Sequence, residues 1–142
     1  MARITRRLDF DYGHRVLGHE SKCARLHGHR GVADITVDSL GLDSLGRVID
    51  FSQIKLKVGK WIDEELDHNM LLHPDDPLLL CDPIIFAGKA PFIMPAYAKN
   101  PTAENIAHVI FDKAVELLNG GGLSVYRVRV WETPNCHADH LA

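Results

Sequence analysis

Two segments in which core-type and polar side chains alternate constrain the fold of this chain more than any other feature. In the first segment, every second residue belongs to one row, which ends in an imidazole: Leu8, Phe10, Tyr12 and His14. In the second segment, one face carries a longer row: His27, His29, Gly31, Ala33, Ile35 and Val37. Successive side chains of a strand point to opposite faces, so both segments predict half-buried strands. Three histidines then lie in core-facing rows.

Two further strands are predicted from shorter patterns. Residues 41–46 indicate a turn, and residues 47–51 indicate a short returning strand. Segment 27–51 would then form an antiparallel hairpin. The last predicted strand, 124–132, carries one row of core-facing side chains: Tyr126, Val128, Val130 and Glu132.

Helical spacing of apolar residues predicts two helices. The first runs from about residue 53 to 66, and Ser52 can cap it. The second begins at Asn100-Pro101-Thr102 and ends at Asn119 and the three glycines that follow. Between the helices, residues 73–101 hold six of the seven prolines and predict a long, partly packed loop.

The order of these elements predicts an α+β protein with an antiparallel four-stranded sheet and two helices on one face. No regular alternation of strand, helix and strand supports a parallel sheet. The 142 residues suit a single domain, 1–142, with residues 73–99 as a long loop insertion. A chain of this length can bury a core without a metal or a disulfide, so any metal is expected to serve chemistry.

Composition argues against several classes of protein. The net charge of -3 provides no basic field for nucleic acid or for an anionic membrane. No apolar window approaches the length of a membrane span, and we expect a cytoplasmic location. The cysteines are odd in number, which favours reduced thiols over a disulfide framework: Cys23, Cys81 and Cys136.

The histidines predict a metal site. His27 and His29 project in parallel from one strand face, and His14 ends another core-facing row. Neutral imidazole nitrogens are preferred ligands of zinc, and three protein ligands leave one tetrahedral position open for substrate or water. An ordinary surface pair is the alternative for His27 and His29 taken alone.

Cys23 is a candidate reactive thiol. It lies four residues before His27 and is flanked by Lys22 and Arg25, so nearby positive charge favours its thiolate as a base or nucleophile. It could instead be the fourth zinc ligand. The site would then be closed, and the protein would be a noncatalytic zinc-binding module with one cysteine and three histidine ligands.

Two further groups could act on protons or substrate. Asp67 can orient His68 and raise its basicity, although a helix-end pair stabilised by the helix dipole is the alternative. Glu132 ends an otherwise apolar row and needs a hydrogen-bonding partner such as a cationic or amidine-like ligand edge. Fraying of the strand into solvent is the alternative for Glu132.

The segment from Cys23 to His29 has the pattern Cys-x-x-x-His-Gly-His, which resembles the signature of the 6-carboxytetrahydropterin and 6-pyruvoyltetrahydropterin synthases. Other blocks of that family have counterparts in the same order: residues 10–14, 46–51, 66–68, 101–105 and 132–133. Six ordered blocks make coincidence improbable, and they span nearly the whole chain.

The resemblance implies the tunnelling fold, in which subunits assemble into barrels, usually as a homohexamer of two trimers with active sites at the interfaces. It implies a Zn²⁺ held by His14, His27 and His29, and 7,8-dihydroneopterin triphosphate as substrate. It further implies that the Cys23 thiolate abstracts a proton and that Asp67 and His68 relay protons. Glu132 is implied to bind the pterin's amino-pyrimidine edge, and Thr102 and Glu104 to lie near the pterin pocket.

The spacer between Cys23 and His27 and the pair Asp50-Phe51 resemble the bacterial 6-carboxytetrahydropterin branch. That branch implies a lyase of queuosine or 7-deazapurine biosynthesis, which releases acetaldehyde and triphosphate. The alternative is 6-pyruvoyltetrahydropterin synthase, which does not cleave the side chain. The sequence departs from the family pattern at Tyr12-Gly13, at His140 where an aromatic residue is common, and in the length of residues 73–99.

Overall fold

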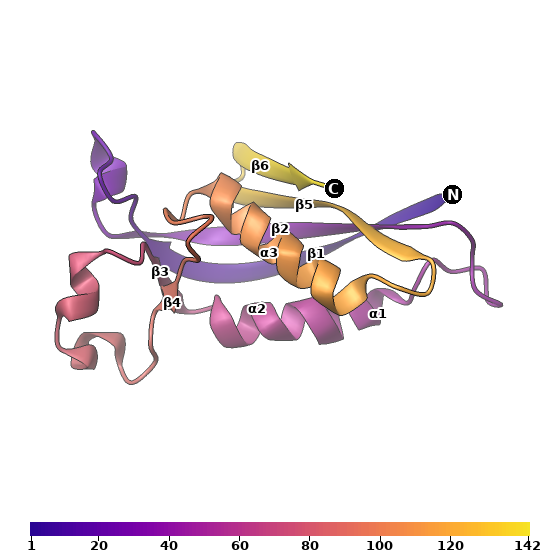
Figure 1. Cartoon of the computed structure of the whole chain (residues 1–142), viewed down its shortest axis with the longest axis horizontal. Helices are drawn as coiled ribbons and strands as arrows, with labels where there is room; N and C mark the ends of the chain where they lie inside the picture. Colours follow the sequence, from indigo (N-terminus) through magenta and orange to yellow (C-terminus); the bar gives the residue numbers. More distant parts are fainter.

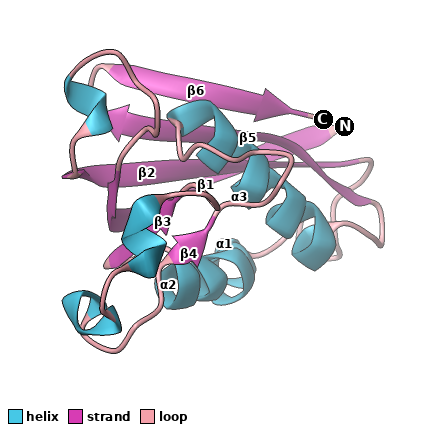
Figure 2. Ribbon diagram, turned by 60° about the vertical axis from the view of Figure 1, so that its left-hand side comes forward, coloured by secondary structure: helices cyan, strands magenta, loops and turns pink.

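The computed structural model describes all 142 residues as one mixed six-stranded sheet with its helices packed on one side (Figures 1 and 2). The strands lie in the order β4-β3-β1-β2-β5-β6. Their bounds are β1 (Ala2–His14), β2 (His27–Ser39), β3 (Asn69–Leu72), β4 (Phe92–Ile93), β5 (Leu123–Thr133) and β6 (Cys136–Leu141). Pairing is antiparallel along β1-β2-β5-β6 and parallel between β1 and β3 and between β3 and β4.

The two long alternating segments form β1 and β2, as predicted. The strands pair in antiparallel register from Ala2 opposite Ser39 to His14 opposite His27. Phe10, Ile35 and Val37 are among the side chains that their inner faces bury completely or nearly so. The opposite faces of these strands carry exposed charged side chains. Periodicity alone therefore identified which side of these strands meets the core.

The first predicted helix is present but begins earlier than expected. It runs without a break through α1 (Phe51–Ile54), a π turn (Lys55–Gly59) and α2 (Lys60–Glu65). The prediction of Ser52 as its cap was wrong. The Asp50 carboxylate accepts a hydrogen bond from the Ser52 N–H at 2.8 Å, so Asp50 is the cap and Ser52 lies inside the first turn.

The second predicted helix is α3 (Ala103–Leu118). Thr102 caps it, because its hydroxyl accepts a hydrogen bond from the Asn105 N–H at 3.3 Å. The buried stripe of α3 packs into the core with the first helix and with the inner faces of β1, β2 and β5. The stripe consists of Ile106, Ala107, Val109, Ile110, Phe111, Ala114 and Leu118. No helix in the structure combines the length and the apolarity that crossing a membrane requires.

The predicted strand over residues 47–51 is absent, and the predicted 27–51 hairpin was wrong. Residues 40–50 form turns instead. The Asp43 carboxylate accepts hydrogen bonds from the backbone N–H groups of Leu45 and Arg47, both at 2.9 Å, and from the Arg47 side chain. This local hydrogen bonding satisfies the backbone without a partner strand. β2 pairs with β1 and β5 instead.

The prediction of an antiparallel four-stranded sheet was also wrong. The sheet has six strands and contains two parallel pairings. β3 and β4 are too short, at four and two residues, to show a periodicity of their own. β6 is an edge strand with no fully buried residue, so it lacks the apolar row that signals a strand.

The insertion over residues 73–99 is anchored rather than free. It contains two 3₁₀ turns, Pro77–Leu80 and Pro83–Phe86, and then β4. Asp76 caps the first turn, and the residue is 2% exposed. Arg15 donates two hydrogen bonds to the Asp76 carboxylate, at 2.7 and 2.5 Å, from the position directly after His14. The insertion is thereby fixed to the end of β1.

Replacing Asp76 by alanine should lower the free energy of unfolding by about 2–3 kcal/mol, because Arg15 loses its buried partner and the 3₁₀ turn loses its cap. The neighbouring Asp75, with an 80% exposed side chain, provides the matched control. Asp75→Ala should change the same quantity by less than about 0.5 kcal/mol. Urea unfolding followed by circular dichroism measures both variants. Equal effects would contradict an anchoring role for Asp76.

Candidate active site

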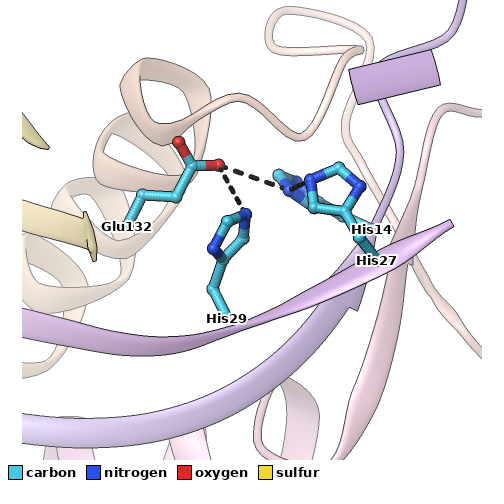
Figure 3. A group of neighbouring side chains, drawn as sticks. All are labelled: His14, His27, His29 and Glu132. Carbon is cyan, nitrogen blue, oxygen red and sulfur yellow. Dashed lines mark hydrogen bonds and ion pairs between the residues drawn. The ribbon is translucent and has the colours of Figure 1, made fainter. Parts of the chain in front are cut away.

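Three histidines and one glutamate converge at one end of the sheet (Figure 3). His14 ends β1, His27 and His29 begin β2, and Glu132 lies near the end of β5. The Nε2 atoms of His14 and His27 are 3.0 Å apart. The Glu132 Oε1 atom is 3.3 Å from the His14 Nε2 and 3.2 Å from the His29 Nε2. The three predicted metal ligands therefore meet, and Glu132 joins them.

Backbone carbonyls orient two of the imidazole rings. The His14 Nδ1 lies 2.6 Å from the Pro101 carbonyl oxygen, and the His27 Nδ1 lies 2.6 Å from that of Arg25. A carbonyl can only accept, so each Nδ1 carries a proton and donates it. The two Nε2 atoms of the neutral rings then present lone pairs to each other at 3.0 Å. Such a contact is stable only with a cation between the two nitrogens, either a shared proton or a metal ion.

The donor set fits a metal ion. Zinc–nitrogen bonds of about 2.0–2.1 Å in a tetrahedron separate neighbouring ligand atoms by about 3.3 Å. The separations of 3.0, 3.2 and 3.3 Å lie close to that value. In addition, the His29 Nε2 is buried and forms no hydrogen bond, and its 3.2 Å contact with the Glu132 carboxylate joins two groups that a shared cation would stabilise. The four side chains could thus hold one metal ion.

The charge states of the group also suit a metal. Contact with His14 lowers the pKa of Glu132, against the opposing effect of burial, and the charges of the neighbouring imidazoles add to the shift. Burial lowers the pKa of His29 and thereby favours its neutral form, although the charge of Glu132 opposes this. An anionic Glu132 and a neutral His29 are the protonation states that metal binding requires of these two side chains.

Tyr12 packs beside this group. Its ring contacts those of His14 and His29, with centroids 5.1 and 5.7 Å away. The residue is 3% exposed, and its hydroxyl has no hydrogen-bond partner. Its bulk fits because Gly31 has no Cβ, which would collide with the Tyr12 ring. Burial raises the pKa of Tyr12 well above its usual range, so the group remains a neutral phenol.

The predicted Asp67–His68 pair is formed, and β1 holds it in place. The His68 Nδ1 is 2.8 Å from the Asp67 Oδ2. The Asp67 Oδ1 accepts a hydrogen bond from the Asp11 N–H at 2.7 Å, and the His68 N–H donates to the Asp11 carbonyl at 2.6 Å. His68 has a φ of 53°, a left-handed conformation that is costly for a residue with a side chain. The backbone hydrogen bond to Asp11 holds His68 in that conformation, and the bond to Asp67 orients its imidazole.

This pairing shifts both pKa values in opposite directions. The hydrogen bond to Asp67 raises the pKa of His68, and the charge of Asp11 adds to the effect, while Lys89 opposes it. Burial would raise the pKa of Asp67, but hydrogen bonds from the Asp11 N–H and from His68 outweigh it and lower the value. His68 is exposed and can exchange protons with a ligand or with solvent.

His68 lies in a cavity of about 750 Å³ at this end of the sheet. The insertion forms one wall of the cavity through Phe86 and Lys89. The Lys89 ammonium also donates a hydrogen bond to the Asp67 carbonyl oxygen at 3.1 Å. The insertion therefore contributes a cation next to the acid–base pair, which the sequence pattern did not indicate.

The histidine group and the Asp67–His68 pair lie on opposite faces of the sheet. His14 points to the core face of β1, whereas the alternation of the strand places Asp11 on the other face. The Asp11 carboxylate clusters with Asp67 and His68. The chain thus brings both predicted centres to the same end of the sheet, where His27, His29 and His68 line one cavity.

Cys23 is not part of either group. It lies in a short 3₁₀ turn, Lys22–Ala24, within the connection between His14 and His27, and its side chain is half-buried. Its backbone carbonyl accepts a hydrogen bond from Val16 N–H at 2.8 Å. The fourth potential ligand atom of the histidine group comes from Glu132 and not from this thiol. The structure therefore does not support the ligand set of one cysteine and three histidines.

The remaining predicted residues have structural surroundings of their own. Thr102 caps α3, and Glu104 is exposed in the first turn of that helix, where the helix dipole stabilises a carboxylate. His140 stacks flat on His108, with centroids 4.1 Å apart and an angle of 9° between the rings. The imidazole thus packs as an aromatic residue would.

The sequence did not indicate which groups orient the predicted metal ligands. The acceptors for His14 and His27 are the backbone carbonyls of Pro101 and Arg25. A carbonyl is present at every residue, so its use as a partner leaves no signal in the sequence. Glu132 did carry a signal, an acid ending an apolar row, but the pattern could not identify the histidines as its partners.

Comparison with known proteins identifies the family of this chain. The sequence matches the family described as 6-pyruvoyl tetrahydropterin synthase over residues 3–141. Proteins of Rickettsia felis and Rickettsia typhi named 6-carboxy-5,6,7,8-tetrahydropterin synthase are 42% and 41% identical to it over 140 residues, which is 98% of this chain and 99% of each relative.

Solved structures show the same fold. An uncharacterized protein from Wolinella succinogenes superposes with a TM-score of 0.77 at 27% identity, covering 99% of this chain and 97% of the other. The 6-pyruvoyl tetrahydropterin synthase of Caenorhabditis elegans gives 0.71 at 19% identity, with 99% and 95% covered. The whole-length sequence match, together with a six-stranded mixed sheet that ends in three converging histidines, shows that the chain belongs to the 6-pyruvoyl tetrahydropterin synthase family.

Proposed function

We propose that the protein is a zinc-dependent lyase that converts 7,8-dihydroneopterin triphosphate to 6-carboxy-5,6,7,8-tetrahydropterin and releases acetaldehyde and triphosphate. The observation that carries the proposal is the convergence of His14, His27 and His29 in a chain whose relatives at about 40% identity bear that enzyme name. Queuosine or 7-deazapurine biosynthesis is the proposed pathway, and the cytoplasm the proposed location.

In this proposal the three histidines hold Zn²⁺. The bound ion supplies Lewis-acid polarisation of the substrate's side-chain oxygen atoms and acidifies the adjacent carbon-bound hydrogen. Glu132 faces the histidines in the structure, so the substrate has to draw this carboxylate away from them. The amino-pyrimidine edge of a pterin can do so, because its N–H groups donate hydrogen bonds to a carboxylate.

The remaining residues bind the pterin or move protons. The Cys23 thiolate takes the carbon-bound proton, and His68, oriented by Asp67, passes protons onward. Thr102 and Glu104 contribute to the pterin pocket. Their position supports this role, because Thr102 follows Pro101 directly, Glu104 lies two residues further on, and the Pro101 carbonyl contacts the metal ligand His14.

We further propose a homohexamer with active sites between subunits. The opposite placement of His14 and His68 on the sheet supports this assembly, since a second copy could bring its own His68 to the metal face. The edge strand β6 supports it as well, because β6 pairs with β5 alone and leaves a row of backbone groups available to another chain.

The proposed reaction is tested by incubating the zinc-loaded protein with 7,8-dihydroneopterin triphosphate and identifying the products by mass. We expect 6-carboxytetrahydropterin, acetaldehyde and triphosphate, with one zinc per chain. Cys23→Ala should keep its zinc and lose activity by about 100-fold or more, because the base is absent. Cys81→Ala, at an exposed cysteine, is the control. Formation of 6-pyruvoyltetrahydropterin would establish the alternative reaction, and full activity of Cys23→Ala would exclude this thiol as the base.

The role of the Asp67–His68 pair predicts a shift of the pH–rate profile. The Asp67 carboxylate raises the pKa of His68, so Asp67→Asn should let that pKa fall toward the ordinary value of about 6.5. The limb of the profile that reports His68 should therefore move to lower pH in Asp67→Asn. Initial rates measured from pH 5 to about 9 test this shift. An unchanged limb together with a reduced rate would mean that Asp67 acts only on structure.

Subunit-shared active sites predict that two inactive variants restore each other. Cys23→Ala and His68→Ala should each be inactive alone. After mixed refolding at equal amounts, about one quarter of the sites should combine an intact Cys23 from one chain with an intact His68 from its neighbour. The product assay on the mixture measures the recovery. If activity does not return in mixed oligomers confirmed by native mass spectrometry, both residues act within one chain.

A further inference from the structure

The four residues from His14, the last residue of β1, to Leu17 are held at three points by distant parts of the chain. The His14 Nδ1 donates to the Pro101 carbonyl, and Arg15 is held by the buried Asp76 carboxylate. Leu17 is held through both of its backbone groups by the side chain of Asn100. The metal ligand His14 thus begins a short segment that has little freedom to move.

Among these partners, Asn100 links two of the contacts. Its side chain binds Leu17, and its backbone continues into Pro101, which binds His14. Its Oδ1 accepts a hydrogen bond from the Leu17 N–H at 2.9 Å, and its Nδ2 donates to the Leu17 carbonyl at 3.1 Å. The next residue, Pro101, supplies the carbonyl that accepts from His14. A closed circuit of covalent bonds and hydrogen bonds therefore runs from His14 along the backbone to Leu17, across to Asn100 and Pro101, and back to the His14 imidazole.

The backbone of Asn100 is held as firmly as its side chain. Its carbonyl accepts hydrogen bonds from the Thr102 N–H and from the Asn105 Nδ2, both at 2.8 Å. These bonds join the circuit to the first turn of α3. The start of the helix, the Pro101 carbonyl and the His14 ring consequently form one connected unit.

We infer that Asn100 is a positioning residue of the metal centre, which sets the orientation of His14 by fixing the Pro101 carbonyl against the segment from His14 to Leu17. The inference rests on the proposed zinc site. A ligating imidazole is oriented by the acceptor of its other N–H group, and the loss of such a partner weakens metal binding about 10–100-fold. Asn100 acts through that acceptor and does not touch the metal itself.

An amide suits this position for a chemical reason. The two backbone groups of Leu17 require one acceptor and one donor from the same side chain, at the spacing of the two ends of an amide. A carboxylate offers no donor and would place an oxygen atom against the Leu17 carbonyl oxygen. An alanine offers neither contact and would free the connection ahead of α3 to shift.

The test compares Asn100→Ala with Asn119→Ala in the full-length protein. Asn119 is the matched control, because its Oδ1 also accepts a backbone hydrogen bond, from Val125 N–H at 2.8 Å, but at the far end of α3. Zinc affinity is measured on metal-free protein by competition with a chromogenic chelator. The visible spectrum of the cobalt-substituted protein reports the ligand geometry, and thermal unfolding of the metal-free protein reports stability.

Asn100→Ala should bind zinc about tenfold more weakly than the wild type and shift the cobalt spectrum, because His14 is no longer held in its orientation. Asn119→Ala should lose comparable stability and keep wild-type zinc affinity. If Asn100→Ala does not fold, Asn105→Ala decides the question, since it removes one bond to the Asn100 carbonyl and should weaken zinc binding in the same direction.

Zinc affinity within about twofold of the wild type in the Asn100 variant, or in Asn105→Ala if the former does not fold, would overturn the positioning role while leaving the zinc site intact. An equal loss of affinity in Asn119→Ala would likewise overturn it, because a general loss of stability would then explain the effect. A wild-type chain that binds no zinc would overturn the metal centre itself and this inference with it. The first two outcomes leave the proposed lyase untouched.

Discussion

The antiparallel register between β1 and β2 is the constraint on which the candidate site depends. The pairing begins at Ala2 opposite Ser39 and ends at His14 opposite His27. It therefore delivers two imidazoles to the same place on the core face, with His29 two residues further along the same row. A slip of one residue would turn His27 and His29 to the other face. Burial of Ile35 and Val37 in the same row resists that slip, so core packing also enforces the geometry of the site.

The chemistry of the histidine group follows from what holds it. Each of two rings gives its Nδ1 proton to a backbone carbonyl, which leaves electron-rich Nε2 atoms facing each other and the Glu132 carboxylate. Nitrogen lone pairs and a carboxylate at such distances repel one another unless a cation lies among them. The backbone hydrogen bonds thus orient the imidazoles so that their lone pairs converge, and only a positive ion can stabilise that arrangement.

The two ends of the long insertion connect to different centres. Asp76 at its start fixes Arg15 beside the proposed metal ligand His14, whereas Lys89 near its end contacts the Asp67 backbone beside His68. The insertion therefore touches the surroundings of both predicted centres, although these lie on opposite faces of the sheet. Its length was a departure from the family pattern, and its contacts make it a candidate for shaping the substrate cavity.

The sequence by itself determined the elements and residues whose signals are local. Period-2 alternation identified β1, β2 and β5, helical spacing identified both helices, and the histidine positions predicted a metal-binding group whose three imidazoles converge in the structure. Tertiary structure alone decided the parallel pairing of β3 and β4, the edge strand β6 and the failure of the 47–51 strand, because these depend on which distant segment offers a partner. It also decided that Glu132 faces the histidines and that Pro101 holds His14, since contacts between residues far apart in the chain, and contacts made by backbone groups, leave no pattern in the order of side chains.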